Sequence, residues 1–130
     1  MQKIFSHLYK DLINNISKNG HPHEKFLFKS RSHSIVIFCI ASNKSTTLEL
    51  LCENIPYKVV SRSTIQSILK EGVANNFFSK EIDSKDKRQK NYKLSKESKG
   101  ILENWLKNQK KFLSILEAAK KRPLKRGPFI

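Results

Sequence analysis

Two helix-start signals followed by a strand pattern with a charged tip constrain the fold of this chain more than any other feature. Thr46-x-x-Glu49 matches a capping box, in which a hydroxyl and a carboxylate satisfy free amides at the start of a helix. Apolar residues then recur at spacings of three and four, and Pro56 ends the pattern because proline cannot continue a helix. This segment therefore predicts a short amphipathic helix.

A second helix-start signal follows after a turn. Either Ser61 or Ser63 can be the N-cap, and Ser63-x-x-Gln66 repeats the capping-box spacing. The expected helix buries isoleucine and leucine side chains on one face and leaves short polar side chains on the others. It should end near residues 75–76, because asparagine tolerates the left-handed conformation of a helix C-cap almost as well as glycine.

A hairpin pattern comes next. FFSKEI at 77–82 and NYKLS at 91–95 are typical of strands, and the stretch between them is too polar and basic to be buried. A helix, a turn, a second helix with a polar face and a basic hairpin follow the order of a winged helix-turn-helix. We therefore predict a mainly α fold with a small β-hairpin wing. A winged helix-turn-helix suits duplex DNA, because the major groove admits one helix and a cationic hairpin can lie along phosphates.

The net charge agrees with such a partner. The chain has a formal charge of +15, and residues 61–130 hold 18 Lys/Arg against 7 Asp/Glu. This sign indicates a polyanion, either nucleic acid or an anionic membrane surface. No apolar stretch approaches the roughly 20 residues of a membrane-spanning helix, and the start of the chain lacks the apolar segment of a secretory signal. We expect no membrane partner and a cytoplasmic, nucleoid-associated protein.

Two amphipathic segments flank this unit, at 4–16 and 97–121. Their apolar stripes hold more surface than a small core needs, so we expect a homodimer interface formed by Phe5, Leu8, Leu12, Trp105, Phe112 and Leu116. The predicted parts are dimerisation helices at 1–20 and 97–121, a DNA-binding domain at 32–96 and a basic tail at 122–130.

Two features allow more than one interpretation. The run SIVIFCIA at 34–41 is apolar and β-branched, so its propensity favours a strand, although a buried helix also fits. Cys39 and Cys52 lie among apolar residues, which favours buried, reduced thiols. The alternative is redox sensing, which needs an accessible thiolate.

Histidines gather near the end of the first helical segment. His21-Pro22-His23, with Glu24 and His33, could be drawn as a metal site. A turn after the helix is the simpler interpretation, because proline between two histidines favours one. We expect no metal and no cofactor.

SRSTIQSIL in the second capped helix, followed by Asp83-x-x-Asp86-x-Arg88 and Leu94-Ser95 in the hairpin, resembles the MarR family of winged helix-turn-helix transcriptional regulators. The resemblance covers about residues 32–100. It implies that Arg88 reaches from the wing to DNA, that the acidic pair supports the wing, and that 34–41 is a buried helix. It also admits a small-molecule effector, for which the sequence identifies no residues.

The chain departs from the family pattern in three places. Gly72 stands where the recognition helix usually buries a leucine, Asn76 replaces a common glycine, and IPYKVV lengthens the turn between the two helices. Glycine weakens a helix interior by roughly 0.8–1.0 kcal/mol relative to alanine. The departures therefore bear on the length and tilt of the recognition helix.

The predicted function is sequence-specific binding of double-stranded DNA by a homodimeric transcriptional regulator. The recognition helix, at about 61–75, enters the major groove, and the wing, at about 79–93, contacts the backbone or minor groove. Arg62 and Gln66 are the best candidates for base contacts, because arginine suits guanine and glutamine suits adenine. The full DNA-binding set is Ser61, Arg62, Ser63, Thr64, Gln66, Ser67, Lys70, Lys85, Lys87, Arg88 and Lys90, with Asp83 and Asp86 as wing support. The alternative is an architectural or otherwise non-specific DNA-binding protein, and no residue pattern indicates an enzyme.

Overall fold

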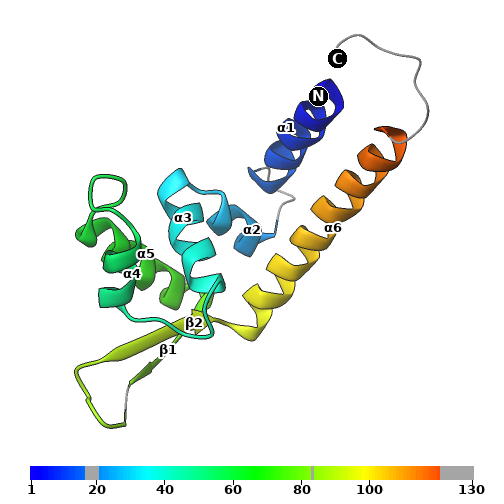
Figure 1. Ribbon diagram of the computed structural model, residues 1–130. Helices are drawn as coiled ribbons and strands as arrows, with labels where there is room; N and C mark the ends of the chain where they lie inside the picture. The colour runs from blue at the N-terminus through cyan, green and yellow to red at the C-terminus, as the bar shows by residue number, and fades with distance from the viewer. Residues whose placement is uncertain (17–20, 83, 121–130) are drawn as a thin grey trace.

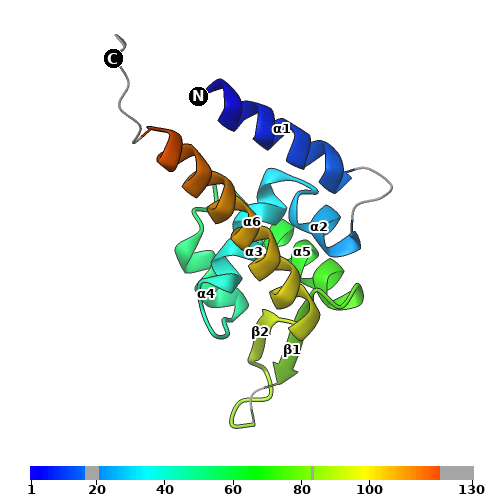
Figure 2. The same ribbon diagram turned by 90° about the vertical axis from the view of Figure 1, so that its right-hand side faces the viewer.

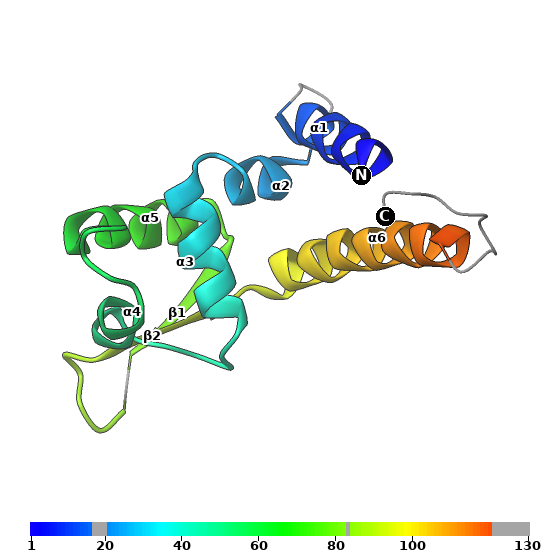
Figure 3. The ribbon, with the colours of Figure 1, turned by 45° about the horizontal axis from the view of Figure 1, so that its top comes forward.

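The computed structural model describes residues 1–16, 21–82 and 84–120. In these residues the element order is α1 (Gln2–Ile16), α2 (Pro22–Leu27), α3 (Arg31–Ala41), α4 (Leu48–Asn54), α5 (Arg62–Ala74), β1 (Phe78–Ile82), β2 (Lys90–Leu94) and α6 (Lys96–Lys120). Figure 1 shows that α3, α4, α5 and the hairpin form one part of the molecule. α1 and α6 lie side by side and extend away from it (Figures 2 and 3). The expected end of the first helix at 19–20 and the basic tail at 122–130 lie outside the described residues.

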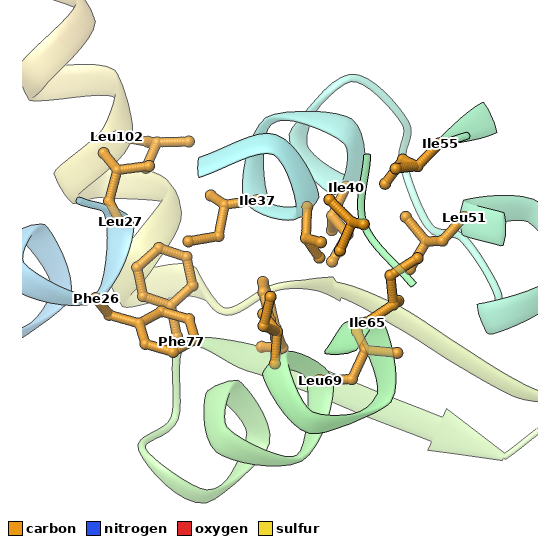
Figure 4. Packing of buried hydrophobic residues seen from close by; sticks show 14 residues of the cluster. Phe26, Leu27, Ile37, Ile40, Leu51, Ile55, Ile65, Leu69, Phe77 and Leu102 are labelled. Carbon is orange, nitrogen blue, oxygen red and sulfur yellow. The ribbon is translucent and has the colours of Figure 1, made fainter. Parts of the chain in front are cut away.

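The hydrophobic core lies between α3, α4, α5 and the start of the hairpin (Figure 4). α3 contributes Val36, Ile37 and Ile40, which are completely buried. The run at 34–41 is therefore helical, and the strand that its propensity favours is wrong. Ser30 caps this helix, because its Oγ accepts a hydrogen bond from the His33 N–H at 3.1 Å. Burial of these three side chains in the core outweighs the β-propensity of the branched residues.

The start of α4 differs from the expected capping box by one residue. The N-cap is Thr47, whose Oγ1 accepts a hydrogen bond from the Leu50 N–H at 3.2 Å. Thr46 instead forms an isolated β-bridge with Tyr92, through two backbone hydrogen bonds of 2.9 and 2.7 Å. The edge of the hairpin uses the backbone of Thr46, so the helix begins one residue later and Glu49 is free for another partner.

α5 begins and ends as the sequence predicts. Of the two candidate caps, Ser61 is the N-cap, and its Oγ accepts a hydrogen bond from the Thr64 N–H at 3.3 Å. Asn75 is the C-cap, and Asn76 has a φ of 63°. Gly72 is buried in this helix, and a Cβ built on it would lie 2.1 Å from Cδ2 of Phe78. The glycine therefore makes room for an aromatic ring where a leucine was expected to pack.

α2 was not predicted from the sequence. The expected turn at His21-Pro22-His23 is wrong, because Pro22 occupies the first turn of this helix, where its missing N–H costs nothing. His21 is the N-cap and accepts a hydrogen bond from the His23 N–H through Nδ1 at 3.0 Å. Phe26 and Leu27 are buried in the core, so a single helical turn anchors this segment. Within the described residues no group of three or more potential metal ligands occurs.

Polar contacts attach α5 to the helices that precede it. His33 Nε2 lies 2.9 Å from Oε1 of Glu71, and Lys29 forms an ion pair with the other carboxylate oxygen. Glu71 therefore ties the last turn of α5 to the start of α3. Because both partners come from outside the helix-turn-helix, this cluster limits how α5 can move against α3.

The predicted hairpin is present and antiparallel. β1 pairs with β2 in a register that places Phe78 opposite Leu94 and Ile82 opposite Lys90. Phe77 and Phe78 are both buried, so the base of the wing is fixed to the core while its tip is exposed. The described residues include no helix with the length and hydrophobicity that crossing a membrane requires.

Candidate nucleic-acid interface

A concavity of about 670 Å³ lies between α4, α5 and the wing. Six residues of the sequence-predicted set line it: Arg62, Gln66, Lys70, Asp86, Arg88 and Lys90. The start of α4 and the middle of β2 complete the wall, through Thr47, Leu48, Glu49 and Tyr92 among others. Residues of the recognition helix and of the wing thus meet at one surface, as a winged helix-turn-helix requires.

The remaining predicted residues of α5 lie around the start of the helix. Ser61, Ser63 and Ser67 are exposed, and Thr64 is half-buried. The Ser61 hydroxyl lies 2.9 Å from the Thr64 hydroxyl and 3.2 Å from the Ser63 hydroxyl. These three hydroxyls therefore form a local cluster that stabilises the first turn of α5.

Arg62 forms a two-armed ion pair with Glu49 in the concavity. Its Nη1 donates to Oε2 of Glu49 at 3.1 Å, and its Nη2 donates to Oε1 at 2.5 Å. The same Nη1 lies 3.9 Å from Sγ of Cys52. The hydrogen bond from Arg62, and then its charge, hold the pKa of the Glu49 carboxyl below its ordinary value. Sequence reasoning missed this pair, because it assigned Glu49 to a capping box.

The wing tip presents Lys85, Lys87, Arg88 and Lys90, which are all exposed. Asp86 accepts a hydrogen bond from the backbone N–H of Arg88 at 3.0 Å, and the same oxygen lies 3.6 Å from Nε of the Arg88 side chain. Asp86 therefore lies close to both the backbone and the side chain of Arg88. Asp83, the other expected support, lies outside the described residues.

Tyr92 is a lining residue that sequence reasoning did not single out. Burial raises the pKa of its phenol, and its backbone forms the bridge to Thr46. Its ring therefore sits where β2, the start of α4 and the concavity meet. The available sequence signal was the alternation in this strand, where Tyr92 and Leu94 flank Lys93.

The two cysteine thiols are less buried than the sequence predicts. Cys39 and Cys52 are both free, and both are half-buried rather than buried. Burial raises the pKa of the Cys39 thiol. Cys39 therefore favours the protonated form and a packing role.

The predicted dimer residues divide into two groups. Phe5, Leu8 and Leu12 are exposed on α1. Trp105 and Phe112 of α6 are half-buried within the chain: the Trp105 indole N–H donates to Asp11 at 3.1 Å, and the Phe112 ring stacks on His7 with the ring centroids 3.9 Å apart. The Leu116 side chain lies outside the described ones. Leu106, Leu113 and Ile115 are further exposed apolar residues of α6.

Two capped helices, a hairpin beside the second one and the concavity between them define a winged helix-turn-helix protein. The chain is similar in structure to the transcriptional regulator SlyA, with a TM-score of 0.55 and 15% sequence identity over 95% of this chain and 78% of that one. It is also similar to reduced AbfR bound to DNA, with a TM-score of 0.52 and 19% identity over 96% of this chain and 94% of that one. No protein-family model and no curated protein matches the sequence. The likeness confirms the winged-helix fold that the resemblance to the MarR family implies.

Proposed function

We propose that this chain is a sequence-specific regulator of transcription that binds double-stranded DNA as a homodimer. One observation carries the proposal: polar residues of α5 and two cations of the wing, Arg88 and Lys90, line the same concavity. A phosphodiester backbone supplies the negative charge that such a surface attracts, and base edges in the major groove supply hydrogen-bonding partners for α5. The similar structure of AbfR is bound to DNA, which supports this class of partner.

The two walls of the concavity contribute different kinds of contact. Arg62 and Gln66 read base edges from α5, while the hydroxyls of Ser61, Ser63, Thr64 and Ser67 and the Lys70 ammonium contact phosphates. The wing cations bind the backbone, and Arg88 enters the minor groove. Affinity then comes mainly from the wing, and sequence preference comes mainly from α5.

The homodimer forms through α1 and α6. The exposed side chains of Phe5, Leu8 and Leu12 on one helix and of Leu106 and Leu113 on the other support this, because so much apolar surface is costly to leave in water. Two-fold symmetry then requires a pseudo-palindromic site with half-sites about 10 base pairs apart.

An architectural protein that binds DNA without sequence preference is the second candidate. The charge of +15 favours it, because cationic surfaces bind all duplexes by counterion release. The two candidates differ in whether a specific duplex outcompetes random DNA.

Selection of bound sequences from a random duplex pool, followed by titrations of variants, tests the proposal. Gln66→Ala should weaken binding to the selected duplex by about 1–3 kcal/mol and change binding to random DNA little. Lys87→Ala should weaken binding to both and lower the slope of log affinity against log salt by about 0.9 per lost phosphate contact.

Lys110→Ala is the matched control, because it removes the same charge from an exposed position on α6. Lys110→Ala should change the affinity for DNA and its salt dependence less than Lys87→Ala does. A selected pool without any consensus would favour the architectural candidate, and an absence of duplex binding would exclude both.

A further inference from the structure

Glu49 is one of two carboxylates, with Asp86, in a concavity that also holds the cations of Arg62, Lys70, Arg88 and Lys90. It lines the concavity with Arg62, Gln66 and Lys70, and its side chain is 70% exposed while that of Arg62 is 51% exposed. An ion pair this exposed contributes little to folding stability. It also opposes the phosphates that the concavity attracts. A contribution to DNA binding therefore explains the Arg62–Glu49 pair better than a contribution to folding stability does.

The geometry of the pair restricts what Arg62 can do. An exposed arginine without a partner binds the nearest phosphate, which carries no sequence information. The guanidinium has five N–H donors, and the carboxylate of Glu49 takes one from each terminal nitrogen. A further Nη1 donor points to Sγ of Cys52, so two donors are left for base edges, and the neighbouring carboxylate repels phosphate from them.

We propose that Glu49 is a positioning residue that makes Arg62 a base reader, and that the preferred half-site holds a G·C pair where this Arg62–Glu49 pair meets the groove. The inference rests on the proposed function and specifies what the concavity recognises. Arginine donates to guanine O6 and N7, and no other base offers one guanidinium two acceptors in the major groove. An Arg62 side chain that Glu49 holds away from phosphate therefore suits a G·C pair.

Selection from a random duplex pool with four proteins tests this inference: wild type, Glu49→Gln, Arg62→Lys and Glu53→Gln. Glu49→Gln keeps the size of the side chain but removes its charge. Arg62→Lys keeps the charge but removes the planar fork. Glu53→Gln is the matched control, because Glu53 is exposed one turn further along α4 and does not line the concavity.

The wild type and Glu53→Gln should select the same consensus with a G·C position in each half-site. Glu49→Gln and Arg62→Lys should both lose that position and keep the others. For Glu49→Gln, the ratio of specific to random affinity should fall about tenfold, as expected for one bidentate base contact. Its affinity for random DNA should rise and depend more steeply on salt, because Arg62 becomes free to bind phosphate.

If Glu49→Gln and Arg62→Lys both select the same positions as Glu53→Gln, the pair does not read bases and the inference is wrong, while the proposed function stands. If Arg62→Lys alone loses the position, Glu49 does not position Arg62, and the inference is also wrong. If the wild type selects no consensus at all, the proposed function itself fails. Equal melting temperatures of the four proteins would show that the differences arise at the DNA contact.

Discussion

Gly72→Ala should destabilise the protein, although alanine is the better helix former. A Cβ at this position would lie 2.1 Å from Cδ2 and 2.4 Å from Cε2 of Phe78. Non-bonded carbon atoms are attracted at about 3.5–4.0 Å and repel strongly below that range. Phe78 is only 2% exposed and begins β1, so its ring cannot turn out into water to avoid the methyl group.

The magnitude follows from two opposing effects. Overpacking a well-packed core costs about 1–3 kcal/mol, and this overlap with a buried ring belongs near the upper end. Replacing glycine by alanine in a helix gains about 1 kcal/mol. The free energy of unfolding should therefore fall by about 2 kcal/mol. Because the displaced ring belongs to the base of the wing, affinity for DNA should fall as well.

Urea unfolding at one fixed protein concentration measures this change, since the stability of a dimer depends on concentration. Gly100→Ala is the matched control, because a Cβ there meets nothing within 4 Å and the residue is exposed in α6. It should raise the free energy of unfolding by about 0.5–1 kcal/mol. Phe78→Leu in the Gly72→Ala background should relieve the overlap, so the two losses should be less than additive.

A Gly72→Ala variant at least as stable as the wild type would refute the reasoning. It would mean that the Phe78 ring moves aside at no cost, and that the close approach is not the reason for a glycine in the recognition helix.

Three further predictions concern the rest of the chain. Leu8→Lys combined with Leu12→Lys should convert the proposed homodimer to a monomer in light scattering, and an unchanged mass would exclude α1 from the interface. Burial alone would raise the pKa of the Glu71 carboxyl, but the hydrogen bonds and charges of His33 and Lys29 outweigh it and lower the pKa. A lowered pKa stabilises the fold above the ordinary range of glutamate and ceases to do so as the pH falls through the folded value. Glu71→Gln should therefore destabilise the protein at neutral pH, and urea titrations should show the difference shrinking in acid; a difference independent of pH would contradict this. Cys39→Ala should lower the free energy of unfolding by about 0.5–1 kcal/mol and leave the response of DNA binding to peroxide unchanged, and loss of that response would contradict a packing role.

Much of the fold was predictable because its signals are local. Ser61 caps α5 through an amide three residues away, and Asn76 ends the same region by its own backbone conformation. Such features act within one turn of the chain, so the residue types at those positions reveal them. The hairpin was predictable for the same reason, since its strands and its polar tip are contiguous in sequence.

The candidate site was predictable only in part. The sequence placed Arg62, Gln66 and the wing cations together, because the order of elements defines a winged helix-turn-helix. It did not predict that Arg62 pairs with Glu49, nor that Trp105 donates to Asp11 within the chain. Both contacts join elements whose relative position depends on how the core packs.

By itself the sequence determined the helices with clear caps, the wing and the basic character of residues 61–130. Only the tertiary structure decided that α4 begins at Thr47 rather than Thr46, that 34–41 is helical, and that Gly72 accommodates a ring. The physical reason is the same in each case. Thr46 bonds to β2, α3 is buried by several other elements, and Gly72 touches the first residue of β1. Contacts between distant segments form only when the chain is folded, and there they outweigh the local preferences that a sequence pattern reports.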